Sequence, residues 1–446
     1  MIPQRVHMVG IGGAGMSALA EVLLARGHQV SGTDAEDSAL LQRLARAGAT
    51  VRVGHDAAAL QDAQLVVWSS AIHADHVERR AAAERGITGM RRGTLLARLM
   101  RDARGVAVAG AHGKTSTTAL LGHVLERCGL DPTVVVGGTL PASGSGARIG
   151  HSNILLAESD ESDGSFLEID PALVVVTNVD REHLEHYGSW EALQQAFAHF
   201  VASAREGAVL CADDAGAMDL AAHCKHAHSY GFAATAQWRA TEVRADGRGM
   251  AFTLAHMGRI IGSGRVPMPG LHYVQNAIAA VAAASTLGAD PARALHALAS
   301  FAGVERRFTV LGERNGITVV DDYGHHPVEI RATLAAARQC TIGRIHTVFQ
   351  PHRFTRTRDL LAEFATAFGA TDTLLLLPIY AAGDTPLPGI TSETLAQRIG
   401  KTRSVECCAT RDEATRLLLQ RAQPGDLVLC LGAGDVNRIG PAFLIS

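Results

Sequence analysis

The sequence predicts an α/β protein with three domains, each built around a mainly parallel sheet. The chain has 446 residues, too many for a single core. Short β-branched runs alternate with longer helical patterns along almost its whole length, which is typical of strand–helix–strand units. Two glycine-rich turns, VGIGGAGMSA and AGAHGKTSTTAL, each join such a strand to such a helix. We expect domains at residues 1–103, 104–304 and 305–446.

The composition favours small-molecule partners. The formal net charge is -3 and positive charge is spread along the chain, so neither nucleic acid nor an anionic membrane surface is favoured. The seven cysteines include no CxxC pair, which favours a reducing compartment. The sequence contains no run of about 18 strongly apolar residues, so membrane insertion is not predicted. We expect a cytoplasmic protein, either a monomer or a homodimer.

In the first predicted domain, strands RVHMVGI, QVSGTD and QLVVWSS alternate with helices SALAEVLLARG and ALLQRLARAG. Gly10, Gly12 and Gly15 form G-x-G-x-x-G between a strand and a helix, and Asp34 closes the next strand. Glycines suit this position because the turn is tight and the backbone must approach a diphosphate at the helix N-terminus. NAD and a uridine diphosphate would both use such a turn.

The second predicted domain has strands GVAVAGA, NILLAESD, PALVVVTNV and GAVLCAD and an Ala-rich helix, VQNAIAAVAAAST. Its turn GAHGKT is a variant of the phosphate-binding loop, with Val108 where the strict motif has glycine. Lys114 would reach terminal phosphates and the Thr115 hydroxyl would hold magnesium. Because the loop is expected to face solvent, we expect Lys114→Ala to abolish activity with little effect on folding.

Acidic and histidine residues follow two further strands of this domain. Glu158 ends the strand NILLAE, at the sheet edge where α/β proteins bind ligands, and could neutralise magnesium. His183 and His186 form H-x-x-H, a spacing found in zinc sites. Zinc is only weakly indicated, because no cysteine or third histidine lies at a supporting spacing.

The third predicted domain has strands ITVVDD, RIHTVFQ, DTLLLLPIY and DLVLCLGAG, separated by helices such as PVEIRATLAAARQ and TRDLLAEFATAFG. The segments DDYGHHP and FQPHRFTRTRD each follow a strand, so their side chains are predicted at one sheet edge. Arginines clustered there suit bidentate capture of a carboxylate or phosphate.

Seven stretches together resemble the Mur ligases, ATP-dependent enzymes that form amide bonds in peptidoglycan synthesis. In chain order they are GIGGAGMSALA, GAHGKTSTTALL, DESDGSFL, TNVDREHL, ERRF, DDYGHHP and FQPHRFTRTRDL, spread over nearly the full length. The resemblance is strongest with the branch that joins L-alanine to UDP-N-acetylmuramate. It implies a Rossmann-like N-terminal domain for the UDP moiety, a central P-loop-type ATP domain and a C-terminal Rossmann-like ligase domain.

The resemblance also implies an activity and its partners. The substrates would be UDP-N-acetylmuramate, L-alanine and ATP, with Mg²⁺ or Mn²⁺, and an acyl phosphate would be the intermediate. Catalysis is assigned to Lys114, Glu158, His183, His325 and Arg353. The metal ligands would be Thr115, Glu158 and His183.

Binding residues follow from the same matches. ATP would contact Gly110, Ala111, His112, Gly113, Lys114, Thr115, Ser116, Asn276, Asp322 and Arg307, or its neighbour Arg306. The UDP moiety would contact Gly10, Gly12, Gly13, Ala14, Gly15, Asp34, Ser69 and Ser70. The amino acid and the muramoyl carboxylate would contact Tyr323, His325, His352, Arg353 and Arg356.

The chain departs from the family pattern in three ways, and three other functions stay open. Ala111 and Tyr273 replace a threonine and an asparagine, and no lysine between 114 and 225 could be the metal-bridging carbamylated lysine of other Mur ligases. A peptide-recycling ligase typically reads DDFAHHP and DEYD where this chain reads DDYGHHP and DESD. The others are an NAD-dependent oxidoreductase that uses only the first turn and a non-catalytic nucleotide sensor.

Overall fold

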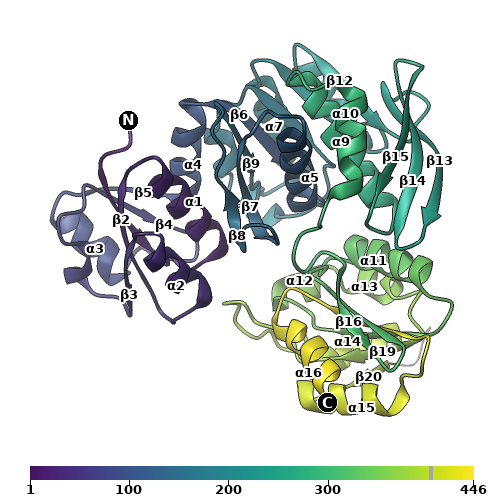
Figure 1. The fold of residues 1–446 in the computed structure, drawn as a ribbon. Coiled ribbons are helices and arrows are strands. Elements are labelled where there is room, and N and C mark those ends of the chain that lie inside the picture. The colour runs from purple at the N-terminus through teal and green to yellow at the C-terminus, as the bar shows by residue number, and fades with distance from the viewer. Residues whose placement is uncertain (401–404) are drawn as a thin grey trace. The chain divides into compact units, whose positions relative to one another are not determined.

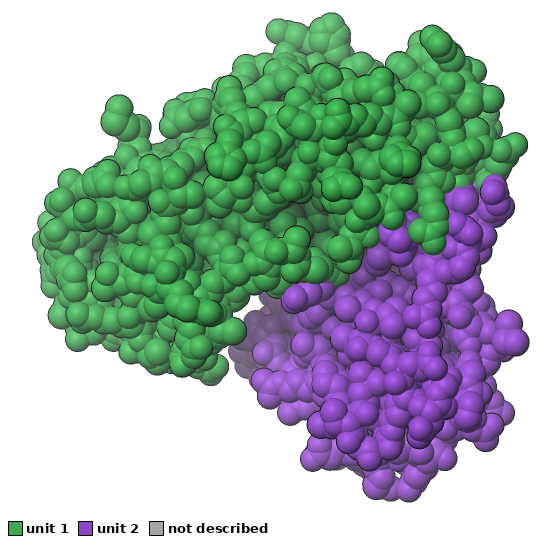
Figure 2. Space-filling view, in the orientation of Figure 1, with its two compact units in different colours: residues 1–242, 252–265, 275–304 green, residues 243–251, 266–274, 305–446 purple. Residues whose placement is uncertain are grey.

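The computed structural model describes residues 1–400 and 405–446 and is built from alternating strands and helices (Figure 1). These residues contain three sheets and fall into two compact units (Figure 2). The first unit comprises residues 1–242, 252–265 and 275–304, and the second comprises 243–251, 266–274 and 305–446. The predicted α/β class with mainly parallel sheets is confirmed. The bounds of the three predicted domains stay a prediction.

The first sheet is fully parallel, in the order β3-β2-β1-β4-β5. Its strands are β1 (Arg5–Val9), β2 (Gln29–Asp34), β3 (Thr50–Val53), β4 (Leu65–Trp68) and β5 (Thr88–Arg91), and its helices are α1 (Ala14–Ala25), α2 (Ala39–Arg46), α3 (Val77–Glu84) and α4 (Arg92–Arg101). The chain changes direction across the sheet between β1 and β4. Ligands of open parallel sheets bind at the carboxyl ends of the strands beside such a switch point.

A buried carboxylate ties α3 to this sheet. The Glu78 side chain is fully buried, and its oxygens lie 3.0 Å from Nε2 of His7 and 2.9 Å from the hydroxyl of Thr33. Nδ1 of His55 lies 3.2 Å away. Burial acts to raise the pKa of Glu78, but the hydrogen bonds from His7 and Thr33 outweigh it and lower that pKa below its ordinary value.

We expect Glu78→Gln to lower the free energy of unfolding at pH 7 by about 1–3 kcal/mol, because the ionised acceptor of this network is lost. A carboxyl whose pKa is lower in the folded state stabilises above its unfolded pKa, and this contribution disappears as the pH falls through the folded value. The difference from wild type should therefore shrink between about pH 5 and about pH 3. Urea unfolding followed by circular dichroism measures it, with exposed Glu84→Gln on the same helix as the control.

The second sheet has ten strands in the order β15-β14-β13-β12-β11-β10-β6-β9-β7-β8. They are β6 (Arg104–Ala109), β7 (Thr133–Leu140), β8 (Ser145–Arg148), β9 (Ile154–Glu158), β10 (Leu173–Val176), β11 (Gly207–Cys211), β12 (Ala227–Gly231), β13 (Trp238–Asp246), β14 (Gly249–His256) and β15 (Arg259–Val266). Its helices are α5 (Lys114–Arg127), α6 (Leu184–Tyr187), α7 (Trp190–Ala202), α8 (Ala215–Asp219), α9 (Leu271–Thr286) and α10 (Pro291–Ala297). Strands β6, β9 and β10 are parallel neighbours, so their carboxyl ends share one edge.

The predicted domain 1–103 and most of the predicted domain 104–304 fall in one unit, in which α1 packs against β7 and β8. Ser145, at the start of β8, donates to Glu21 of α1 at 2.8 Å, and Glu21 also pairs with Arg43 at 2.7 Å. Strands β7 and β8 pair antiparallel, so residues 133–148 form a β-hairpin. The left-handed Gly144 lies in the turn of this hairpin.

The third sheet has the order β16-β17-β21-β18-β19-β20, with only its edge strand β16 antiparallel to its neighbour. Its strands are β16 (Thr309–Arg314), β17 (Ile317–Asp322), β18 (Ile345–Phe349), β19 (Thr373–Leu376), β20 (Val405–Cys407) and β21 (Leu427–Leu431). The helices are α11 (Pro327–Cys340), α12 (Phe354–Asp359), α13 (Leu361–Ala367), α14 (Ser392–Ile399), α15 (Arg411–Arg421) and α16 (Ile439–Ile445). The helix expected over 357–369 is thus broken at Leu360. Within residues 1–400 and 405–446, no helix has the length and apolar character that crossing a bilayer requires.

Candidate active site

The first glycine turn closes tightly over the carboxyl end of β1. Gly10 has a left-handed φ of 74°, and its amide donates to the carbonyl of Thr33 at 2.8 Å. The Gly12 amide donates to Oδ2 of Asp34 at 2.8 Å, and a Cβ at Gly12 would lie 2.9 Å from that oxygen. The turn therefore needs glycine at both positions, and Asp34 holds its backbone. Ser69 and Ser70 follow β4, on the other side of the switch point.

The second glycine turn wraps the N-terminus of α5. Gly110 and Gly113 have φ values of 128° and 81°, which L side chains rarely adopt. A Cβ at Gly110 would clash with the Thr177 hydroxyl and with the backbone of Asn178. A Cβ at Gly113 would lie 3.0 Å from Oδ1 of Asn276, so this predicted ATP residue does lie beside the loop.

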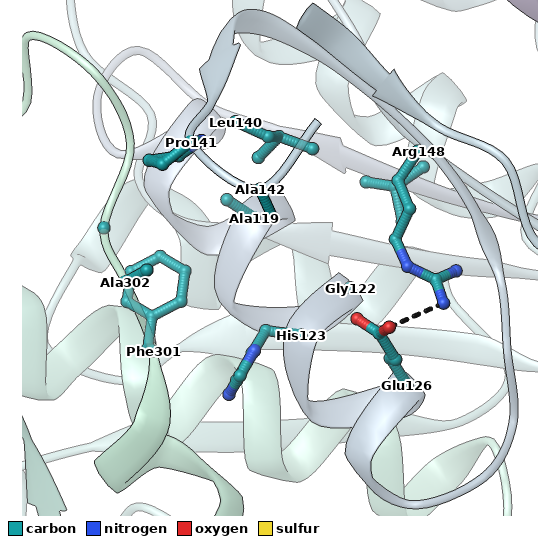
Figure 3. A pocket seen from close by; sticks show the side chains of 12 residues that line it. Ala119, Gly122, His123, Glu126, Leu140, Pro141, Ala142, Arg148, Phe301 and Ala302 are labelled. Atoms are coloured by element: carbon teal, nitrogen blue, oxygen red, sulfur yellow. Dashed lines mark ion pairs between the residues drawn. The ribbon is translucent and has the colours of Figure 1, made fainter. Parts of the chain in front are cut away.

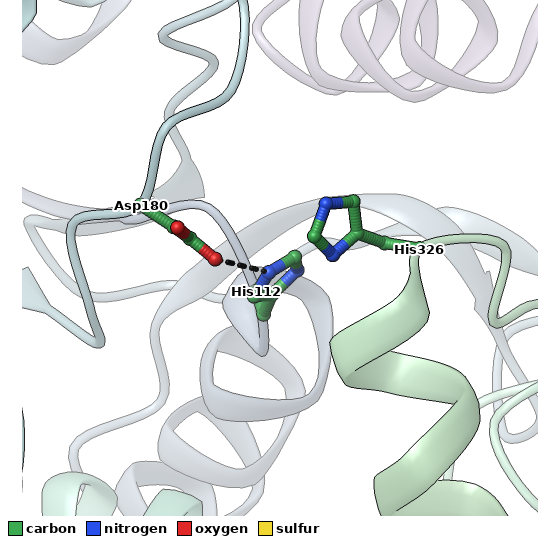
Figure 4. Close-up of side chains that lie close together, drawn as sticks. All are labelled: His112, Asp180 and His326. Carbon is green, nitrogen blue, oxygen red and sulfur yellow. Dashed lines mark hydrogen bonds and ion pairs between the residues drawn. The ribbon is translucent and has the colours of Figure 1, made fainter. Parts of the chain in front are cut away.

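Residues 177–180, in the segment after β10, hold the loop in place. The His112 amide donates to Oδ1 of Asn178 at 2.9 Å, while its carbonyl accepts from the Thr177 hydroxyl at 2.6 Å. Figure 4 shows the His112 ring beside the Asp180 carboxylate, with Nε2 at 3.4 Å from Oδ2. These contacts hold the backbone of the cradle in place. Figure 4 also draws His326, which caps α11 in the second unit.

The sequence predicts Lys114 on a solvent-facing loop. This prediction is wrong. Lys114 is the first residue of α5, its side chain is 14% exposed, and Nζ lies 2.8 Å from Oε1 of Glu161, whose side chain is 3% exposed. Nζ also donates to the carbonyl of Gly110 at 2.6 Å. Burial disfavours the ammonium, but Glu161 and Asp160 outweigh it and raise the pKa of Lys114. The lysine is therefore charged and already paired.

Glu158 and Thr115 meet at the carboxyl end of β9. The Thr115 hydroxyl donates to the Glu158 carboxylate at 3.0 Å, and the Gly137 amide donates to the same carboxylate at 2.7 Å. A hydroxyl and a carboxylate at the mouth of a phosphate cradle are the oxygen ligands that Mg²⁺ prefers.

A second group of possible metal ligands combines one residue after β9 with two residues after β10. One ligand atom each from Glu161, Glu182 and His183 lie within 4.8 Å of one another. His183 has a left-handed φ of 58°, which a non-glycine residue rarely adopts and which is frequent at functional sites. The donor set fits a divalent cation. Of the predicted ligands, Thr115 and Glu158 are in contact, and His183 belongs to this second group.

In the second unit, aromatic rings and guanidinium groups gather at the carboxyl ends of β17 and β18. The guanidinium carbons of Arg306 and Arg307 lie 4.9 Å and 5.1 Å from the Tyr323 ring centre. The His325 ring lies 5.5 Å from Tyr323 and 5.6 Å from His352. The residues predicted from ERRF, DDYGHHP and FQPHRF therefore do form one cluster.

Two arginines and two unpredicted residues complete this cluster. Nη1 of Arg356 lies 3.3 Å from Nδ1 of His352, whose ring stacks on Tyr380. Arg353 adopts a φ of 70° and donates to Asp384 at 2.9 Å. Tyr380 and Asp384 come from the segment after β19, and their sequence context carried no motif that indicated them.

Both histidines of the cluster are neutral at pH 7. Burial lowers the pKa of His325 to about 3, and burial together with Arg356 and Arg353 lowers that of His352 to about 4. A general base is most effective when its pKa lies near the working pH. His325 in this environment is thus suited to hydrogen bonding rather than to accepting a proton.

Asp322 and Tyr273, two positions singled out in the sequence, have structural partners. Oδ2 of Asp322 accepts from the Phe308 amide at 2.8 Å, and Oδ1 accepts from the Gly324 amide at 2.8 Å. Both oxygens of this predicted ATP contact are therefore in use. Tyr273, which replaces the family's asparagine, donates its hydroxyl to the carbonyl of Arg307 at 3.0 Å.

Comparison with known proteins agrees with these motifs. Residues 5–104, 108–284 and 306–434 match the models of the Mur ligase family catalytic domain, the Mur ligase middle domain and the Mur ligase glutamate ligase domain. A protein of an Anaeromyxobacter species named UDP-N-acetylmuramate--L-alanine ligase is 46% identical over 452 residues, covering 99% of this chain and 97% of that protein. The chain belongs to the Mur ligase family.

Two other matches place it within the family. A Solibacter usitatus protein of the same name is 47% identical over 448 residues, and the match covers 99% of this chain and 95% of that protein. The crystal structure of UDP-N-acetylmuramate-alanine ligase MurC from Thermotoga maritima superposes with a TM-score of 0.85 at 28% identity, covering 99% of this chain and 98% of that chain.

This Mur ligase has a separate pocket beside α5 (Figure 3). Its volume is about 70 Å³, and Leu140, Pro141 and Phe301 contribute to its apolar wall. The Glu126–Arg148 ion pair, at 2.8 Å, lies along another side. These charges are already paired and the pocket lies along α5 beyond the phosphate loop, so we assign it no part in nucleotide binding.

Proposed function

We propose that this Mur ligase uses ATP to join L-alanine to the lactyl carboxylate of UDP-N-acetylmuramate, in the cytoplasm, for peptidoglycan precursor synthesis. The products would be ADP, phosphate and the UDP-muramoyl-alanine amide. One observation carries the proposal: a phosphate cradle with a charged lysine lies in the same unit as a second glycine turn. Full-length relatives that bear this activity in their name support it.

The two glycine turns take different nucleotides in this proposal. The turn after β1, with Asp34, Ser69 and Ser70, binds the uridine diphosphate, and residues 1–103 form its domain. The turn before α5, together with Asn276, binds the ATP phosphates within residues 104–304. Residues 305–446 supply Tyr323, His325, His352, Arg353 and Arg356 for the amino acid and the muramoyl carboxylate.

Thr115, Glu158 and His183 would hold divalent cations, and we propose Mg²⁺, with Mn²⁺ as the substitute. Bound there, such ions offset the repulsion between a carboxylate and a polyphosphate. Glu161 and Glu182 lie close to His183, which enlarges the set of ligands that the sequence indicated.

The lactyl carboxylate would attack the γ-phosphate of ATP to give an acyl phosphate and ADP. The amine of L-alanine would then attack the acyl carbon and displace phosphate through a tetrahedral intermediate. The protein needs no nucleophile of its own. Lys114 stabilises the charge that develops during transfer, and the fixed loop amides position the phosphates. Holding three substrates together supplies the remaining acceleration.

A phosphate-release assay tests this proposal. We expect release that requires UDP-N-acetylmuramate, L-alanine, ATP and Mg²⁺ together, with omission of any one reducing the rate to background. Release supported by the L-alanyl tripeptide in place of L-alanine would instead identify the peptide-recycling ligase. A change in nicotinamide absorbance without phosphate release would favour the oxidoreductase, and ATP binding without turnover would favour the sensor.

A further inference from the structure

Arg92 lies where the uridine diphosphate is expected, although no motif indicated it. It begins α4 directly after β5, so it stands at the carboxyl edge of the first sheet together with the glycine turn after β1. A Cβ at Gly15 would lie 2.9 Å from Nη1 of Arg92. The guanidinium thus reaches across β4 to the first turn of α1, and the missing side chain of Gly15 makes room for it.

The guanidinium has donors to spare. Within residues 1–400 and 405–446, it makes no hydrogen bond, and its charged partner is Asp160, with Nη2 at 3.9 Å from Oδ2. This distance is longer than a hydrogen bond. The Arg92 and Asp160 side chains are 27% and 40% exposed, and a pair of this kind contributes little to stability. Structural support alone therefore does not explain the position of the arginine.

A diphosphate at the glycine turn needs a positive charge. None of the residues that the sequence assigned to the UDP moiety is basic, and one of them, Asp34, is acidic. Backbone amides at a helix N-terminus attract an anion, but they supply only partial charge. An arginine can add two parallel hydrogen bonds to phosphate oxygens, which a glycine turn by itself cannot provide.

We propose that Arg92 binds the diphosphate of the uridine nucleotide. This inference rests on the proposed function, because it assumes that the glycine turn after β1 holds that nucleotide. Asp160 faces the same guanidinium and adjoins Glu161, the partner of Lys114, so Arg92 stands between the two nucleotide sites.

Binding of UDP and of uridine, measured by calorimetry on the full chain, tests the proposal. We expect Arg92→Ala to weaken UDP binding about 10- to 100-fold, the usual effect of losing charge-assisted hydrogen bonds, and to leave uridine binding unchanged. The UDP affinity of Arg92→Lys should lie between those of wild type and Arg92→Ala, since lysine keeps the charge but not the bidentate geometry. Exposed Arg91→Ala is the matched control and should bind UDP as wild type does.

Steady-state kinetics gives a second readout. The Arg92→Ala variant should show a raised KM for the UDP-sugar with the KM for ATP within twofold of wild type. Wild-type UDP affinity in a folded Arg92→Ala variant would overturn this inference and leave the proposed function standing. Failure of the wild-type protein to bind UDP would overturn both.

Discussion

Replacing Lys114 by methionine is expected to reduce phosphate release by a factor of about 10³ or more, with the ATP-dependent rate close to background. The ammonium is the cation that the loop itself contributes to the phosphates, and methionine keeps the length of the side chain without the charge. Lys225→Met, at an exposed position, makes the same chemical change and should leave the rate unaltered.

The structure adds a cost in stability to this variant. Without Lys114, the buried Glu161 carboxylate loses its charged partner, and we expect about 1–3 kcal/mol of destabilisation. Burial already raises the pKa of Glu161, so the variant can take up a proton there instead of unfolding.

The double variant Lys114→Met/Glu161→Gln separates the two effects. It should recover most of the lost stability, because a buried amide replaces an unpaired carboxylate, yet it should stay inactive. Thermal unfolding and phosphate release, measured on the same preparations, give the comparison. A Lys114→Met protein with wild-type turnover would remove Lys114 from the mechanism. Recovery of activity in the double variant would show that Glu161, not the lost charge, caused the defect.

The positions of strands, turns and cradles could be predicted because each depends on residues close in sequence. Gly10, Gly110 and Gly113 adopt left-handed conformations that the motifs require, and Glu158 ends its strand as the pattern indicated. The parallel topology then places the ends of β17 and β18 on one sheet edge, which explains why Tyr323 and the segment after Phe349 form one cluster.

The partners of these residues could not be predicted, because they depend on long-range packing. Glu161, in the acidic stretch after β9, is buried against Lys114, 47 residues earlier, and no local sequence signal indicated this contact. Asp384 and Tyr380 meet Arg353 and His352 from a segment without any motif. Burial also decides the charge of His325, which sequence spacing cannot reveal.

Replacing Glu158 by glutamine should lower turnover about 10²-fold or more and raise the Mg²⁺ concentration needed for half-maximal rate. Glutamine has nearly the same shape, and its single oxygen can still accept from the Gly137 amide or from Thr115, so folding should change little. What it lacks is the negative charge that makes a carboxylate a good ligand for a divalent cation.

The comparison is a magnesium titration of phosphate release, with Glu168→Gln as the control. Glu168 is exposed and follows Glu158 by ten residues, so its amide variant reports any nonspecific loss of negative charge in this segment. Mn²⁺, which binds nitrogen and oxygen ligands more strongly than Mg²⁺, should restore part of the activity of Glu158→Gln. If the variant instead reached wild-type rates at the same Mg²⁺ concentration, the carboxylate beside Thr115 would be a structural acceptor for the loop and not a metal ligand.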